Sequence, residues 1–206
     1  MRNFLITSII LSMLLASVQV FAQQKILFGF EKDAEGWQIP DWAFDQADHI
    51  GLSSEVTMDQ ASQGVQSLKV DCDFPGNSWA AAVVEYEQDI DLTGKESISV
   101  DIFVPETRAV GFLQARINIT ADLWYYIEMK KPVMLKAGEW TTVEARIDIS
   151  KSRESAYWKC KAKEECVNEN LDKIKKIAVR VEYDANSRHA GPPYNGPIYF
   201  DNIVIK

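Results

Sequence analysis

F-L-Q-A-R-I-N-I-T, residues 112–120, alternates apolar and polar side chains over most of its length. Successive side chains of an extended strand point to opposite faces of a sheet, so this period of two predicts a strand with one buried face. The apolar face would carry Ala115, Ile117 and Ile119. The opposite face would carry Gln114, Arg116 and Asn118. Such a strand is typical of an antiparallel sheet that covers a core on one side only.

The same alternation recurs along the chain and is interrupted by turn residues such as Gly, Pro, Asn and Asp. The expected strands are 25–31, 66–74, 81–86, 97–104, 112–120, 124–129, 140–149, 177–183 and 197–205. One helical turn or two is the only helical signal, at 168–175. This pattern of about ten short strands predicts an all-β fold, a jelly-roll β-sandwich of two antiparallel sheets.

The first 22 residues have the features of a secretory signal peptide. Arg2 precedes an apolar run at residues 4–15, and Val20-Phe21-Ala22 is a small-x-small cleavage sequence. The apolar run is shorter than the roughly 20 residues that a membrane span needs. We therefore expect a secreted protein, extracellular or periplasmic, with residues 23–206 as one domain and no membrane insertion after cleavage.

The composition favours a soluble, acidic protein. The chain has 22 Lys and Arg against 30 Asp and Glu, a formal charge of −8 and a pI of about 4.9. A basic patch for nucleic acid is not expected from this balance. No internal repeat or linker divides residues 23–206, and we expect a monomer.

The three cysteines suit an oxidising compartment. Cys160 and Cys166 are close enough in sequence to close a small disulfide loop, which the chain-entropy argument values at about 2 kcal/mol. Cys72 alternates with Leu68, Val70 and Phe74, so we expect it to be a buried free thiol.

The polar faces of three expected strands carry the same kinds of side chain. Beside the polar set of 112–120, strand 124–129 would present Trp124, Tyr126 and Glu128, and strand 177–183 would present Ala178, Arg180 and Glu182. Aromatic rings stack on the apolar faces of sugar rings, and planar polar groups bond their hydroxyls. A plain solvated sheet face is the alternative, and the residue types favour a sugar-binding face.

Several motifs together resemble a known family. They are L-F-G-F-E with D-A-E-G-W, D-Q-A-S-Q-G-V-Q-S-L-K-V, F-P-G-N-S-W, K-A-G-E-W-T-T-V and P-I-Y-F-D-N-I-V-I. In this order they resemble the secreted carbohydrate-binding modules of the galactose-binding-like β-sandwich superfamily, similar to modules attached to mannanases and β-glucanases. The resemblance covers essentially all of residues 23–206.

The resemblance implies that the concave sheet binds a plant- or algal-type polysaccharide or oligosaccharide, with β-mannan and β-glucan as the leading candidates. The implied ligand-binding residues are Trp79, Gln114, Arg116, Asn118, Trp124, Tyr126, Glu128, Arg180 and Glu182. Trp42, His189 and Tyr194 are expected in loops that wall the groove. Because such modules usually accompany a catalytic domain, a separate glycan-degrading enzyme is an expected partner.

The resemblance also implies a structural calcium ion. Carboxylates of Glu31 and Asp201 would meet on the convex side, and oxygens around Asp33 and Gln63 would complete the oxygen shell that calcium prefers. From the residues alone, both carboxylates are equally compatible with ordinary turns.

Two other functions stay open. The sequence lacks the motifs of nucleophile elbows, phosphate loops and metalloproteases, and we assign no catalytic residue. A glycoside hydrolase with Glu128 and Glu182, joined by Glu85, is the enzymatic alternative, as is a polysaccharide lyase with Tyr126 beside Arg116. A secreted protein whose polar sheet binds another protein is the third class. Non-catalytic binding is the favoured hypothesis.

Overall fold

A computed structural model describes residues 25–76, 78–105, 110–147, 157–160, 171–183 and 191–206. The expected signal peptide lies outside these ranges, as do Cys166 and His189. Secretion and the 160–166 disulfide therefore stay predictions.

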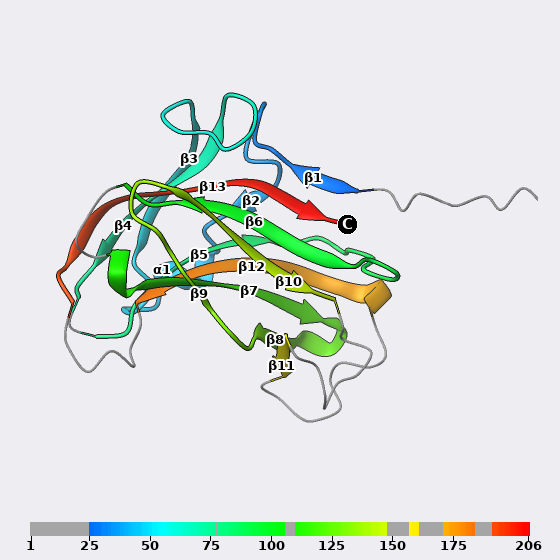
Figure 1. Cartoon of the computed structure of the whole chain (residues 1–206). Coiled ribbons are helices and arrows are strands. Elements are labelled where there is room, and N and C mark those ends of the chain that lie inside the picture. Colours follow the sequence, from blue (N-terminus) through cyan, green and yellow to red (C-terminus); the bar gives the residue numbers. More distant parts are fainter. Residues whose placement is uncertain (1–24, 77, 106–109, 148–156, 161–170, 184–190) are drawn as a thin grey trace, which may run out of the picture.

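Two antiparallel sheets form the molecule, stacked as two layers (Figure 1). Sheet A runs in the order β10 (Trp140–Arg146), β6 (Ser97–Phe103), β13 (Tyr194–Ile205), β4 (Ser67–Phe74) and β3 (Gly51–Thr57), with β1 (Ile26–Phe28) on β13. Sheet B runs in the order β11 (Trp158–Cys160), β8 (Tyr125–Met129), β7 (Leu113–Ala121), β12 (Ile174–Tyr183), β5 (Ala81–Tyr86) and β2 (Trp37–Gln38), with β9 (Val133–Met134) on β7. The predicted all-β sandwich is confirmed.

Helical structure in the described ranges is limited to short turns. They are α1 (Asp41–Phe44), η1 (Val110–Phe112), η2 (Asp122–Trp124) and η4 (Leu171–Lys173). Of the helical turn or two expected at 168–175, residues 168–170 lie outside the described ranges, Leu171–Lys173 form η4, and β12 begins at Ile174. No helix within the described ranges is long and apolar enough to cross a membrane.

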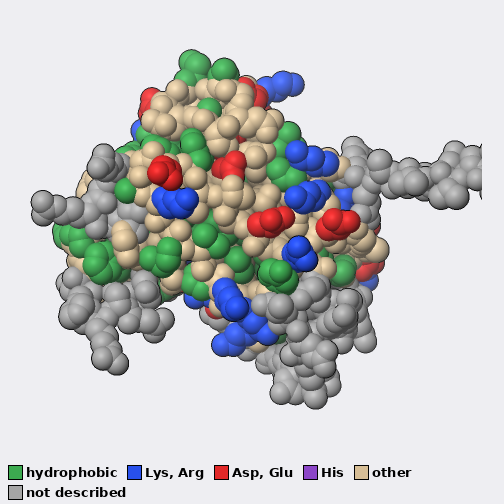
Figure 2. Space-filling model, viewed as in Figure 1, with side chains coloured by type: hydrophobic (Ala, Val, Ile, Leu, Met, Phe, Trp, Pro, Cys, Tyr) green, Lys and Arg blue, Asp and Glu red, His purple; other side chains and the backbone are tan. Residues whose placement is uncertain are grey.

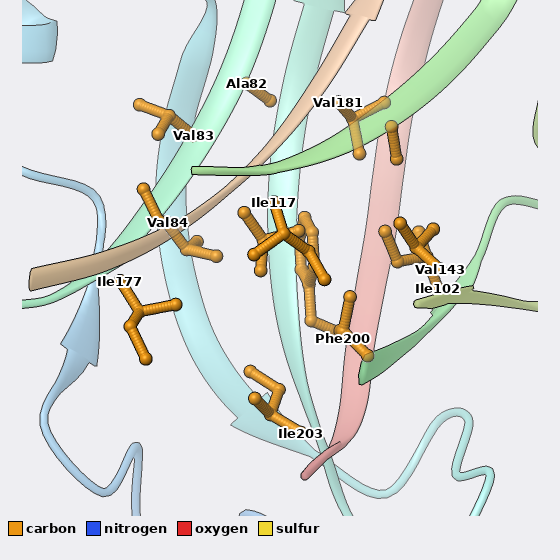
Figure 3. Packing of buried hydrophobic residues seen from close by; sticks show 14 of the residues in the cluster. Ala82, Val83, Val84, Ile102, Ile117, Val143, Ile177, Val181, Phe200 and Ile203 are labelled. Carbon is orange, nitrogen blue, oxygen red and sulfur yellow. The ribbon is translucent and has the colours of Figure 1, made fainter. Parts of the chain in front are cut away.

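The core fills the space between the sheets with aliphatic and aromatic side chains from both (Figure 3). Ile117 and Val181 of sheet B and Ile102, Val143 and Phe200 of sheet A are fully buried in one cluster. Burying a side chain of this size stabilises the fold by about 1.5–3 kcal/mol. The apolar half of each alternating strand therefore fixes which face of sheet B points away from the core.

Four strands were not expected from the sequence. β2, β9 and β11 are two or three residues long, too short to show a period. β3 reads G-L-S-S-E-V-T and is an edge strand of sheet A whose central residues are exposed on both faces, so no apolar alternation marks it. The expectation for Cys72 is confirmed, since it is a free thiol and 1% exposed.

Acidic and basic side chains of the described residues are mixed on the side of the molecule seen in Figure 2. Ion pairs such as Lys69 with Glu55 at 3.1 Å join neighbouring strands of sheet A on its outer face. On the outer face of sheet A, this pair brings opposite charges together across neighbouring strands.

Candidate ligand-binding face

The face of sheet B that points away from the core is polar, and strand register brings its residues together. Arg116 of β7 lies opposite Arg180 of β12, and Gln114 lies opposite Glu182. On the other side of β7, Asn118 pairs with Glu128 of β8. We call this surface the polar face of sheet B; its residues are Glu85, Gln114, Arg116, Asn118, Thr120, Tyr126, Glu128, Lys176, Ala178, Arg180 and Glu182.

Two arginines placed directly opposite each other repel unless acidic groups lie between them. Glu182 supplies that charge: its carboxylate is 2.6 Å from Arg116 Nε and 2.8 Å from Arg180 Nη2. Gln114 Nε2 donates to the same carboxylate at 3.0 Å. Glu128 completes the group at 3.1 Å from Arg180 and 3.7 Å from Arg116. We call these five residues the arginine–glutamate cluster.

The arginine–glutamate cluster is largely shielded from solvent. The Glu182 side chain is only 4% exposed, and the Arg116 and Arg180 side chains are 16% and 13% exposed. Arg116 also donates from Nη1 to the carbonyl oxygen of Met129 at 2.8 Å. These charges are therefore held by one another rather than by water.

Tyr126 joins the edge of this cluster. Its hydroxyl accepts a hydrogen bond from Arg180 Nη1 at 3.1 Å. Burial of the ring raises the pKa of Tyr126 to about 12, in spite of the opposing effect of Arg180. The phenol therefore stays protonated at neutral pH, as a tyrosine side chain ordinarily does.

A second group of contacts lies beside the cluster, around Lys176. Lys176 Nζ is 3.1 Å from Glu85 Oε2 and 3.1 Å from Glu87 Oε2. The same ammonium lies 5.3 Å from the centre of the Trp124 ring, a cation–π contact. Trp42 Nε1 donates to Glu85 Oε2 at 3.3 Å from the other side.

Trp124 lies just before β8, in the turn η2, and not in the strand where the sequence placed it. Its φ of +62° is incompatible with a strand and uncommon for a bulky residue. The ring nevertheless reaches the polar face through Lys176, and the residue is 62% exposed. It is the most exposed aromatic residue in the described ranges.

The β5 side of the polar face is bordered by three rings. Trp42 meets His49 edge-on at 4.8 Å, and His49 meets Trp79 at 5.8 Å. Trp79 in turn lies 5.8 Å from the guanidinium of Arg180. Trp79 and Trp42 are therefore at the rim, as expected, whereas Tyr194 is 6% exposed at the start of β13 and does not line the groove.

Seven of the nine predicted ligand-binding residues lie on the polar face of sheet B, and the other two lie beside it. Trp124 and Trp79 lie at its edge, while Asn118 is 2% exposed and offers no accessible surface in this arrangement. Lys176 was not predicted, because the expected strand began at residue 177. An earlier start would have placed Lys176 in alternation with Ala178 and Arg180.

The four residues expected to bind calcium form a different arrangement. Asp201 is fully buried, and its Oδ2 accepts the N–H groups of Ser62 at 2.7 Å and Gln63 at 2.9 Å. Glu31 Oε1 accepts the N–H of Val65 at 2.9 Å. Asp33 Oδ1 accepts the N–H of Glu35 at 2.7 Å.

Nitrogen–hydrogen donors thus face the two carboxylates where calcium would need oxygen ligands. Within the described residues, no group of three or more His, Cys, Asp or Glu side chains is placed to hold a metal. The arrangement as it stands does not fit the ion, and the calcium site stays a prediction.

Comparison with known proteins shows a shared fold. No model of a protein family matches the chain, and no curated protein sequence matches it. A structure on the promiscuous specificity of carbohydrate-binding modules of the β-sandwich superfamily aligns with a TM-score of 0.54 and 14% identity. That alignment covers 87% of this chain and 61% of the other.

Two further solved structures are similar over most of their length. A family 28 carbohydrate-binding module specific for non-crystalline cellulose aligns with a TM-score of 0.57 and 12% identity, over 86% of this chain and 91% of the other. A family 11 module from Clostridium thermocellum, in complex with a β-1,3-1,4-mixed-linked tetrasaccharide, gives 0.50 and 13%, over 88% and 94%. The chain has the β-sandwich fold of these modules.

The shielding of Glu182 generates a stability prediction. Glu182→Gln removes the charge that separates Arg116 from Arg180, and we expect the free energy of unfolding to fall by about 3–5 kcal/mol, as when one partner of a buried ion pair is removed. Urea denaturation measures this. Glu87→Gln is the matched control, because Glu87 is 56% exposed in its pair with Lys176; its change should stay below about 1 kcal/mol. Equal effects of the two substitutions would contradict the account.

Proposed function

We propose that this protein binds a polysaccharide, without catalysis, on the polar face of sheet B. The observation that carries the proposal is the position of Trp124 and Trp42, which are 62% and 41% exposed beside that face. Large indole rings are normally buried unless they meet something, and here planar polar groups lie next to them. This is the combination of stacking surfaces and hydrogen-bonding groups that sugars require.

The charge balance of the face favours a neutral ligand. Lys176 and the two arginines each lie within salt-bridge distance of carboxylates, so the face has no unpaired cation with which to attract an acidic polymer. Neutral β-glucan and β-mannan suit such a surface. Two of the modules that share the fold are described as binding cellulose and a mixed-linked tetrasaccharide, which supports a glucan as the first ligand to test.

The remaining parts of the proposal concern context. The signal sequence at residues 1–22 supports secretion as part of the proposal. Because we assign no catalytic residue to this protein, we propose that a separate enzyme degrades the glycan that it binds. We propose that the protein acts as a monomer.

Trp124→Ala tests the proposal directly. Loss of an exposed stacking surface should weaken polysaccharide binding by about 1–3 kcal/mol while leaving the melting temperature unchanged. Affinity electrophoresis against glucans and mannans, preceded by a glycan array, measures the loss. Leu52→Ala is the control, since Leu52 is 59% exposed on β3 of the other sheet and should bind like the wild type. No retention of the wild type on any glycan would refute the proposal.

The same glycans distinguish binding from catalysis. Release of reducing ends by the wild type, abolished by Glu128→Gln or Glu182→Gln in a variant that is still folded by circular dichroism at the assay temperature, would overturn the non-catalytic proposal in favour of a glycoside hydrolase. Polysaccharide that is bound and recovered without new reducing ends supports it.

Calcium binding at the loop around Gln63 is tested by chelation. If calcium at about a hundred times its Kd stabilises the fold, replacing it with EDTA should lower the melting temperature by about 5–10 °C. An unchanged melting temperature together with no metal in elemental analysis would contradict the calcium site predicted from the sequence. The N–H bonds to Glu31 and Asp201 would then hold the loop alone.

A further inference from the structure

We infer that the ligand lies along a diagonal path from Trp42, over Glu85 and Lys176, to Trp124, and that it is an internal segment of a neutral linear polysaccharide. This inference rests on the proposed function and identifies which residues of the polar face touch the sugar. Glu85 and Lys176 are outside the set of ligand-binding residues that the sequence predicts, and Trp42 was expected only in a loop that walls the groove.

Solvent exposure separates the two ends of the path, Trp42 and Trp124, from the arginine–glutamate cluster. Between them, the side chains of Glu85 and Lys176 are 9% and 13% exposed, and they differ from the cluster in the hydrogen-bonding capacity they have left. In the cluster, Glu182 already receives bonds from Arg116, Arg180 and Gln114, and its side chain is 4% exposed. A sugar hydroxyl that displaced one of these bonds would have to replace a charge-assisted bond with a weaker one. The exposed indoles at the two ends of the path require no such exchange. The cluster therefore supports the site, and the two exposed indoles are its main contact surfaces.

A continuous line of contacts joins the two indoles. Trp42 Nε1 is 3.3 Å from Glu85 Oε2, that oxygen is 3.1 Å from Lys176 Nζ, and Lys176 Nζ is 5.3 Å from the centre of the Trp124 ring. Each indole is thus fixed by a polar contact before any ligand arrives. Such preorganisation reduces the entropy that binding must overcome.

The Glu85–Lys176 pair has hydrogen-bonding capacity left for a ligand. Glu85 uses Oε2 for both Trp42 and Lys176, and none of the described residues donates to its Oε1. Lys176 carries three N–H donors and gives one to Glu85 and one to Glu87. An acceptor and a donor side by side match the two roles that a sugar hydroxyl plays at once.

The separation of the indoles sets the size of the ligand. Trp42 contacts β5 from the side of α1, whereas Trp124 lies at the end of β7, with β12 between these strands. Neighbouring strands are about 4.8 Å apart, so the two rings are on the order of 10 Å apart. One pyranose ring cannot stack on both, but linked sugars can. Because both indoles are open to solvent, the chain can continue past each of them.

The test is isothermal titration of the mature protein with cello-, mixed-linkage and manno-oligosaccharides of increasing length, and with the parent polymers. Trp42→Ala and Glu85→Gln should each weaken binding of the preferred oligosaccharide about tenfold or more. Affinity should rise steeply from the disaccharide to the length that spans both indoles. One polymer chain should bind several molecules of the protein along its length.

Two matched controls isolate the path. Glu87→Gln removes the other carboxylate partner of Lys176, also at 3.1 Å, but lies off the path and should change affinity less than twofold. Phe44→Ala removes a residue that is 57% exposed on the same short helix as Trp42 and should bind like the wild type. Melting temperatures of all variants check that the fold is retained.

The outcomes separate the path from the proposed function. If Trp124→Ala weakens binding but Trp42→Ala and Glu85→Gln do not, the path is wrong and the proposed function stands. Full affinity for a monosaccharide, or for chain ends only, also overturns the path. If the wild type binds none of these glycans, both the path and the proposed function fail.

Discussion

Arg116 and Arg180 occupy directly opposite positions on the two central strands of sheet B, and the site depends on how that repulsion is overcome. Glu182 lies within 2.8 Å of both guanidinium groups, and Glu128 lies within 3.7 Å of both. Removing one acid would leave a shielded charge unpaired, so the members of the cluster stabilise one another as a set. The arginine–glutamate cluster thereby fixes the side chains at the centre of the polar face. The rings at the edge contact this face through Arg180 and Lys176.

The division between a shielded centre and an exposed edge gives the residues of one sheet face different roles. Residue type alone would assign every Arg, Glu, Gln and Trp on the face to ligand contact. Burial separates them: Asn118 and Glu182 are 2% and 3% exposed, whereas Trp124 is 62% exposed. The central residues position the surface, and the exposed aromatic edge is left to meet a ligand. The Glu85–Lys176 pair between the two indoles is shielded, but it has hydrogen-bonding capacity left.

The pattern of about ten short strands predicted the sandwich. The alternation of residues 112–120 and 177–183 assigned their polar side chains to one face, because burial of alternate apolar residues dictates strand orientation. The edge strand β3 escaped prediction because its G-L-S-S-E-V-T sequence buries no face. The contact of Trp42 with Glu85 joins residues 43 positions apart and depends on where α1 meets β5, which no local pattern encodes. The hydrogen bonds of Glu31 and Asp201 to the loop around Gln63 could not be predicted from a local pattern either. The backbone conformation of the loop decides which of its groups face a carboxylate.

The central claim is that the polar face of sheet B is the sugar-binding surface, and the six tryptophans allow a direct measurement. In a ¹H–¹⁵N correlation spectrum, titration with a glucan or mannan oligosaccharide should shift the indole resonances of Trp124 and Trp42. The indole of Trp37, buried in the core, and that of Trp140, on sheet A, should stay unchanged. Shifts confined to Trp140, or none at any indole under conditions in which the oligosaccharide is bound, would contradict the account.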